Sequence, residues 1–140
     1  MNANRKKLID GLNAALQNEL GNVIRYLHHS FLVTGINRGP LVELFREKAQ
    51  ESFNHATELG EKIVALGGHP TVKVPPMKEI GHKSTEDMLR EELGSEKEEV
   101  EGYIRLLRLV GDDIALEFML KEIIKDEQEG IDDLQRRLAK

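Results

Sequence analysis

Apolar residues recur at intervals of three and four positions along four stretches of the chain, which is the spacing of amphipathic helices. The pattern predicts helices over residues 4–34, 40–66, 85–110 and 113–139. No stretch carries a competing strand signal. Long helices joined by short, long and short connections are typical of a four-helix bundle with one crossover. We therefore expect an all-α, antiparallel four-helix bundle in which residues 1–140 form a single domain.

Proline and capping residues mark the ends of these helices. The connection 67–84, between the second and third helices, holds three of the four prolines and is the expected crossover. Pro40 is expected at the first position of the second helix, where its missing N–H costs nothing. Ser84 and Asp87 resemble a weak capping box for the third helix. Asp112 is the expected N-cap of the fourth.

Three glutamates lie at the centres of apolar stripes, where carboxylates are not expected. At about 100° per residue, Glu19, Glu96 and Glu127 are each flanked by the apolar residues of their own helix. The stripe of the second helix centres on Ser52, with His55 one turn later. These positions lie near the middle of their helices, and mid-helix positions of a bundle meet at one level. We expect the three carboxylates and the imidazole to converge in the centre.

Burying an unpaired carboxylate is costly, and neighbouring like charges add repulsion. Protonation, a buried Lys or Arg, or a bound cation would relieve that cost. Lys48 lies one turn from Ser52 and is within reach of the centre. A metal ion held by oxygen and imidazole ligands fits the predicted donors better.

Each of these residues also has a simpler interpretation. A single Glu in a stripe is commonly a boundary residue whose stem packs while its head reaches water. Ser52 alone is ordinary core filling, and His55 alone is more often a hydrogen-bonded core histidine than a ligand. Three glutamates at one level favour the metal site. The acidic run 96–101 is read as a solvated face apart from Glu96, with Glu99 on the flank. The remaining histidines are predicted to be surface or interface residues: His28, His29, His69 and His82.

The amino-acid composition excludes several classes of function and of metal site. With 25 acidic and 20 basic side chains, the formal net charge is −5, which excludes a generic nucleic-acid-binding surface. The chain has no cysteine, so disulfides, thiolate zinc sites and thiol nucleophiles are excluded. Oxygen and imidazole ligands favour iron or manganese over structural zinc. The sequence has neither a membrane-length apolar run nor a signal-peptide pattern, so we expect a cytoplasmic protein without a membrane partner.

Four segments carry a resemblance to the ferritin-like superfamily, and most closely to the bacterioferritins. They cover almost the whole chain: LNAALQNELGNVIRYLHH, FNHATELGEKIVALGGHPT, STEDMLREELGSEKEEV and LKEIIKDEQEGIDDLQRRL. The family carries an internal duplication in which each half pairs one Glu with a Glu-x-x-His motif on the next helix. Here Glu19 is followed by Ser52-x-x-His55 and Glu96 by Glu127-x-x-Gly130, at similar spacings.

The resemblance implies roles for five residues. Glu19 would be a terminal carboxylate ligand of a first metal, and His55 its imidazole. Glu96 would be the terminal carboxylate of a second metal, and Glu127 a bridging carboxylate. Tyr26 would be the phenol beside the metals, with a catalytic role. Iron is the implied metal, as one or two ions, with manganese or zinc as alternatives.

The chain departs from the family pattern at two ligands. Ser52 stands where the family has a bridging Glu, and Gly130 where it has a His. Candidate accessory ligands are Glu51, Ser52 and Glu99. A single metal, an asymmetric pair and a vestigial site all remain open.

Two further departures concern haem and assembly. Phe53 replaces the haem-ligating Met two residues before His55, so haem is not predicted. The sequence stops at Lys140, after the fourth helix, without the fifth helix of ferritin shells. We therefore expect a homo-oligomer, a dimer or larger, for which a 24-subunit cage is not assured.

Three functions follow from this reading. The first is Fe(II) oxidation with O₂ or peroxide, serving iron storage or detoxification, as a ferroxidase-type oxidoreductase. The second is a metal-binding, peroxide-handling or oxidase relative that does not store iron. The third is a non-catalytic bundle with a decayed site, acting as an interaction or assembly protein.

Overall fold

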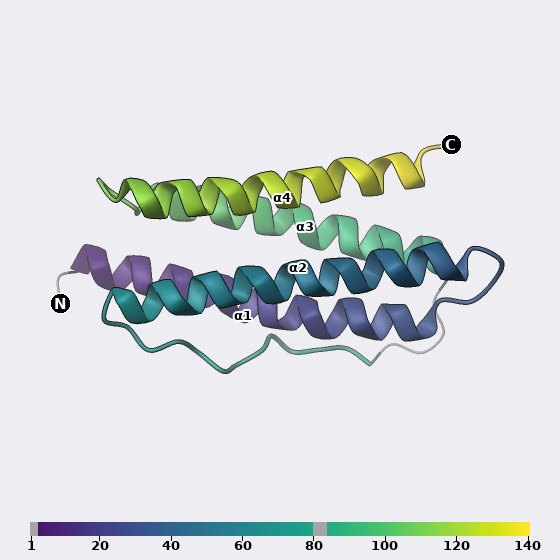
Figure 1. Cartoon of the computed structure of the whole chain (residues 1–140), viewed down its shortest axis with the longest axis horizontal. Coiled ribbons are helices and arrows are strands. Elements are labelled where there is room, and N and C mark those ends of the chain that lie inside the picture. Colours follow the sequence, from purple (N-terminus) through teal and green to yellow (C-terminus); the bar gives the residue numbers. More distant parts are fainter. Residues whose placement is uncertain (1–2, 80–83) are drawn as a thin grey trace.

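Four long helices make up the fold in the computed structural model, which describes residues 3–79 and 84–140 (Figure 1). The helices are α1 (Ala3–Leu32), α2 (Arg38–Ala65), α3 (Thr85–Leu107) and α4 (Ile114–Leu138). The described residues contain no strand. The predicted all-α four-helix bundle with a crossover between the second and third helices is therefore confirmed.

The helices form two antiparallel pairs, α1 with α2 and α3 with α4, stacked as two layers (Figure 1). The connection after α2 runs back along the α1 side, so α2 and α3 point the same way. Asn13 fastens it: Nδ2 donates to the carbonyl of His69 (3.0 Å), and Oδ1 accepts from the Thr71 N–H (2.8 Å). Further on, Pro75 packs on Gly21, where a Cβ would lie 2.7 Å from the proline ring.

The observed helix ends differ from the predicted ones by up to three residues, and the first helix ends at Leu32 instead of residue 34. The second helix begins at Arg38, which puts Pro40 third in the helix instead of first. The third helix ends at Leu107, three residues early. Asp113, rather than Asp112, caps α4, because its Oδ1 accepts from the Leu116 N–H at 3.0 Å. The Ser84 cap is confirmed by its hydrogen bond from the Asp87 N–H (3.1 Å).

Two separate apolar clusters fill the bundle. One packs the end that contains Leu12, Leu59 and Leu120, and the other packs the end that contains Phe45, Met88 and Leu134. Most of the buried residues outside both clusters are polar or charged, among them Glu19, His55, Glu96 and Glu127. This polar layer lies at the level where the sequence predicts the three glutamates.

No helix within 3–79 or 84–140 combines the length and the apolar character needed to cross a membrane.

Candidate metal centre

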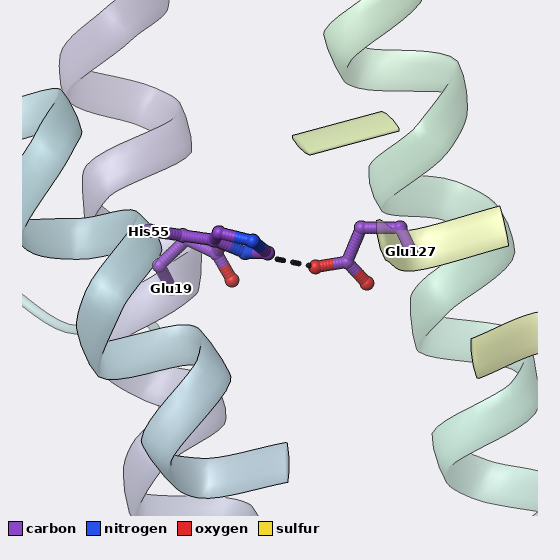
Figure 2. A group of neighbouring side chains, drawn as sticks. All are labelled: Glu19, His55 and Glu127. Carbon is purple, nitrogen blue, oxygen red and sulfur yellow. Dashed lines mark hydrogen bonds and ion pairs between the residues drawn. The ribbon is translucent and has the colours of Figure 1, made fainter. Parts of the chain in front are cut away.

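Glu19, His55 and Glu127 meet in the middle of the polar layer, from α1, α2 and α4 (Figure 2). Each offers one ligand atom, and these atoms lie within 4.8 Å of one another. His55 Nδ1 is 2.8 Å from Glu19 Oε2 and 3.4 Å from Glu127 Oε1. All three side chains are at most 3% exposed. Two buried carboxylates facing one imidazole nitrogen form a donor set suited to a divalent metal ion.

Neighbouring side chains hold these three in place. Tyr103 donates its hydroxyl proton to Glu19 Oε2 (3.0 Å), and Asn22 Nδ2 donates to Glu19 Oε1 (3.0 Å). His55 Nε2 bonds to Asp126 Oδ2 at 3.0 Å, which turns Nδ1 toward the two glutamates. A carboxylate on the far nitrogen commonly orients a metal-binding imidazole. The sequence reasoning assigned no role to Asp126, although it directly precedes Glu127.

The metal-free centre holds a proton on His55. Burial alone would lower the pKa of this imidazole, but hydrogen bonds to Glu127 and Glu19, and the charge of Glu19, raise it to about 11. Burial raises the pKa of Glu127 to about 7, with repulsion from Glu19 and Glu96 adding to the rise and the His55 contact opposing it. Negative charge is therefore in excess around the imidazolium.

These shifts predict that the metal-free protein loses stability as the pH rises from about 5 to 9. His55 stabilises the fold fully below its ordinary pKa of 6.5, and that contribution is lost as the pH rises toward 11. Glu127 keeps a proton in the fold between 4.5 and about 7, so its contribution also falls with rising pH. Urea unfolding with a chelator at several pH values measures the slope. His55→Gln should flatten it, whereas the exposed His69→Gln should not; a wild-type slope of the opposite sign would contradict the assignment.

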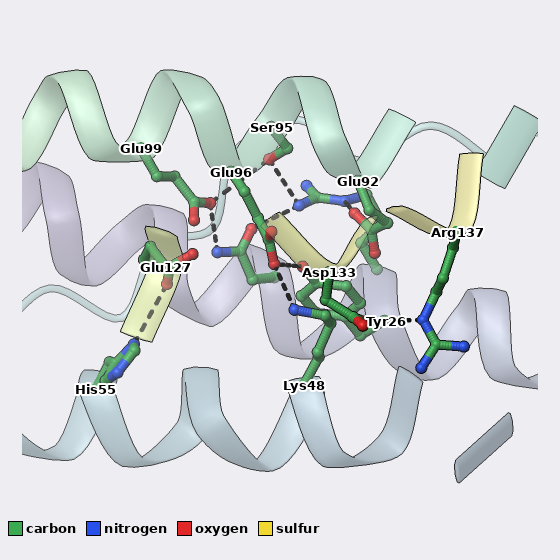
Figure 3. A network of polar contacts seen from close by, with 12 residues as sticks. Tyr26, Lys48, His55, Glu92, Ser95, Glu96, Glu99, Glu127, Asp133 and Arg137 are labelled. Carbon is green, nitrogen blue, oxygen red and sulfur yellow. Dashed lines mark hydrogen bonds and ion pairs between the residues drawn. The ribbon is translucent and has the colours of Figure 1, made fainter. Parts of the chain in front are cut away.

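Glu96, the fourth predicted ligand, lies in the same layer but has different partners (Figure 3). Lys48 Nζ donates to its Oε1 at 2.9 Å, and the Tyr26 hydroxyl donates to the same oxygen at 2.6 Å. Its Oε2 is buried and has no hydrogen-bond partner among the described residues. Gly130 faces this pair, since a Cβ there would lie 2.5 Å from Lys48 Nζ. The predicted phenol beside the centre thus contacts Glu96, and an ammonium group stands where a second metal was considered.

The candidate accessory residues surround the centre without joining the cluster of three. Ser52 is buried, and Glu51 is half-buried beside a cavity of about 210 Å³ that Lys48 and Gly130 also line. Glu99 is buried and accepts a hydrogen bond from Asn22. Burial and the charges of Glu127 and Glu19 raise the pKa of Glu99 well above its usual range. Glu99, which the sequence places on the flank of the stripe, is therefore a buried member of the polar layer.

A second buried ion pair lies next to the centre and was not predicted. Glu92 is 0% exposed and receives Arg25 Nε at 2.5 Å. His29 Nδ1 lies 3.3 Å from the other Glu92 oxygen. His29 is 3% exposed, so its prediction as a surface or interface residue was wrong. The reason is that α1 packs against both α2 and α3, so its buried arc is wider than the stripe around Glu19.

His28, His69 and Phe53 are not among the buried side chains of the polar layer. His28 is half-buried and His69 is exposed, while His82 falls outside the described residues. Phe53 is exposed on α2.

A cavity of about 400 Å³ between α1 and α3 reaches the centre from outside. Its walls include Glu19, Asn22, Glu99 and Tyr103, and Pro75 of the crossover connection lies at its edge. Arg25 and Arg105 also line the cavity, together with Glu98, so its walls carry charges of both signs.

Comparison with known proteins yields one family and many similar folds. The ferritin family model, which describes a ferritin-like domain, matches residues 9–140. A bacterioferritin of Rhodobacter capsulatus is 27% identical over 136 residues, or 95% of this chain and 83% of that protein. A ferritin-like di-iron-carboxylate protein of Bacillus anthracis superposes with a TM-score of 0.93 and 31% identity, over 99% and 100% of the two chains. A dodecameric thioferritin of Bacteroides fragilis, a bacterioferritin-related protein, superposes with a TM-score of 0.85 and 27% identity, over 96% and 85%.

Proposed function

This chain belongs to the ferritin family, and we propose that it binds Fe(II) at Glu19, His55 and Glu127 and oxidises it with O₂ or peroxide. The observation that carries the proposal is the convergence of these three buried ligands from three helices, within 4.8 Å. The resemblance to bacterioferritins, predicted from the sequence, is confirmed by relatives of modest identity. Iron binding and oxidation is the activity that agrees best with both the ferritin family and the two-carboxylate, one-imidazole donor set.

The protein's own groups have separable tasks in this proposal. Glu19 and Glu127 supply the negative charge that favours Fe(III) over Fe(II), and Tyr103 and Asn22 fix the Glu19 carboxylate. His55 would release the proton on Nδ1 when an ion binds. The proton on Nε2 would stay on the ring, hydrogen-bonded to Asp126. Fe(II) is the substrate and supplies one electron per ion to the oxidant.

We expect aerobic oxidation of Fe(II) by the wild-type chain to outpace oxidation in buffer alone. His55→Ala should slow the protein-dependent rate on the order of 100-fold, because it removes the one nitrogen ligand. The exposed His69→Ala is the matched control and should keep the wild-type rate. Ultraviolet absorbance of Fe(III)–carboxylate species follows the reaction. A wild-type rate equal to that of buffer would refute the oxidase function.

A non-catalytic role is the second candidate, and the Lys48–Glu96 pair favours it, since it occupies one of the four predicted ligands. Binding of Fe(II) without accelerated oxidation would support this role over the first.

We also propose that the chain forms a homo-oligomer, supported by the dodecameric state of the Bacteroides fragilis relative. Native mass spectrometry tests it, and a purely monomeric spectrum would contradict it.

A further inference from the structure

The polar layer consists of two halves related by the internal repeat of the chain. Tyr26 and Tyr103 each lie seven residues after a central glutamate. Each tyrosine donates its hydroxyl proton to the glutamate of the other half: Tyr26 to Glu96 (2.6 Å) and Tyr103 to Glu19 (3.0 Å). Glu19 and Glu96 therefore each accept a hydrogen bond from the tyrosine of the other repeat. On α1 and α3 the halves differ at Asn22, which donates to Glu19, and at its counterpart Glu99. The other differences lie on α2 and α4.

The halves differ in what faces the glutamate. Glu19 faces the imidazole of His55 at 2.8 Å, with Glu127 alongside. Glu96 faces the ammonium of Lys48 at 2.9 Å, and the position on α4 that matches His55 is Gly130. Figure 3 shows Lys48 reaching from α2 across to Glu96 on α3. The Glu19 side, together with Glu127 from the second repeat, thus offers three metal-ligand atoms, whereas the Glu96 side already contains a cation.

Gly130 makes room for that cation. A Cβ at this position would lie 2.5 Å from Lys48 Nζ and 2.8 and 3.0 Å from the two Glu96 oxygens. Such distances are too short for a real side chain, so any larger residue would displace the ion pair. Glycine in a helix interior is unfavourable, and here the space it leaves is filled by a charged contact.

The buried Lys48 ammonium is stabilised by its ion pair with Glu96. Its residue is 8% exposed, and Glu96 is 2% exposed. Burial acts against the charge, but the attraction and hydrogen bond of Glu96 outweigh it and raise the pKa of Lys48 above its usual value. The charge that neutralises Glu96 therefore belongs to the protein itself.

We propose that Lys48 takes the place of a second metal ion, so that the centre binds one ion per chain, with Glu96 as the counter-ion of Lys48 instead of a ligand. The inference rests on the proposed metal site at Glu19, His55 and Glu127 and specifies its stoichiometry. It also gives the departures at Ser52 and Gly130 one cause: without a second ion, the centre needs neither a bridging carboxylate at position 52 nor an imidazole at position 130.

The first test counts bound Zn(II), a redox-inert probe, by titration calorimetry and elemental analysis of the full chain. The wild type should bind one ion per chain. Glu96→Gln should also bind one, with an affinity within a few-fold of wild type, because Glu96 is not a ligand. Two ions in the wild type, or loss of Zn(II) from Glu96→Gln, would overturn the role of Lys48. No bound ion in the wild type would instead contradict the proposed metal site itself.

The second test rebuilds the other half. Lys48→Met combined with Gly130→His should raise the count to two ions per chain, since an imidazole and a free Glu96 then mirror His55 and Glu19. Lys62→Met, on the same helix but paired with Asp113 (3.3 Å), is the control and should stay at one. Thermal unfolding of the metal-free chains establishes that each variant is folded. A folded double variant that still binds one ion would overturn the proposal; if it does not fold, the wild-type and Glu96→Gln counts decide.

Discussion

Replacing Glu127 with glutamine is expected to lower the affinity for a divalent metal ion by about 100-fold or more while leaving the metal-free fold at least as stable. The loss in affinity follows because the change removes one of three buried ligands, and even residues that only support a ligand cost 10–100-fold. The stability follows because Glu127 is repelled by Glu19 and Glu96 in the metal-free state. Glutamine removes the repelled charge but keeps an oxygen that accepts from His55 Nδ1, so the contact with the imidazolium is retained and the fold should not weaken.

The matched control for this experiment is Glu129→Gln on the same helix. Glu129 is exposed, and its contact with Lys125 is loose, at 3.9 Å. Titration of Fe(II) without oxygen, or of Zn(II), gives the affinities, and urea unfolding gives the free energies. Unchanged affinity in Glu127→Gln would place the metal elsewhere. A large loss of metal-free stability would make Glu127 a structural hydrogen-bonding residue.

Replacing Arg25 with methionine is expected to destabilise the protein by about 3–5 kcal/mol, the usual cost of leaving one member of a buried ion pair alone. Glu92 is fully buried and contacts Arg25 Nε at 2.5 Å. The same guanidinium donates through Nη2 to Asn22 Oδ1 and Ser95 Oγ, both at 2.7 Å. Its loss therefore leaves a buried charge and two polar side chains without their donor.

Urea unfolding also measures this effect, and a double variant isolates its cause. Arg25→Met with Glu92→Leu should recover much of the loss, because a buried pair replaced by apolar side chains is commonly neutral or stabilising. Arg90→Met is the exposed control: its pair with Glu86 spans one helical turn at the surface and contributes at most about 1 kcal/mol. A loss below 1 kcal/mol in Arg25→Met would show that Glu92 has another source of compensation.

Periodicity predicted the fold and the level of the site because both follow from local geometry. The position of a residue on a helix depends only on its number along that helix, so Glu19, Glu96 and Glu127 were identified as inward-facing before any contact was known. Long helices with one long connection then leave few ways to fold. His55 was identified by the same argument, one turn from the centre of its stripe.

The burial of His29 could not be found in this way, whereas Glu92 lies about 40° from Glu96 on the same stripe and was within reach of the projection. A helical projection assumes one buried stripe, whereas α1 packs against both α2 and α3 and buries a wider arc. Glu92 satisfies its charge with Arg25, which lies 67 residues away in sequence. Pairing between distant residues leaves no periodic signal in either helix.

The sequence by itself therefore determined four amphipathic helices, their order and the three carboxylates at one level, because helical periodicity is a property of neighbouring residues. Only the tertiary structure decided which cation meets which carboxylate. A helical projection gives only the direction of Cβ, whereas the Lys48 ammonium lies four bonds beyond Cβ. It contacts Glu96 on α3 in the space that Gly130 on α4 leaves open. In the proposed metal site, that contact distinguishes a centre for one metal ion from a centre for two, and it exists only once α2, α3 and α4 are packed together.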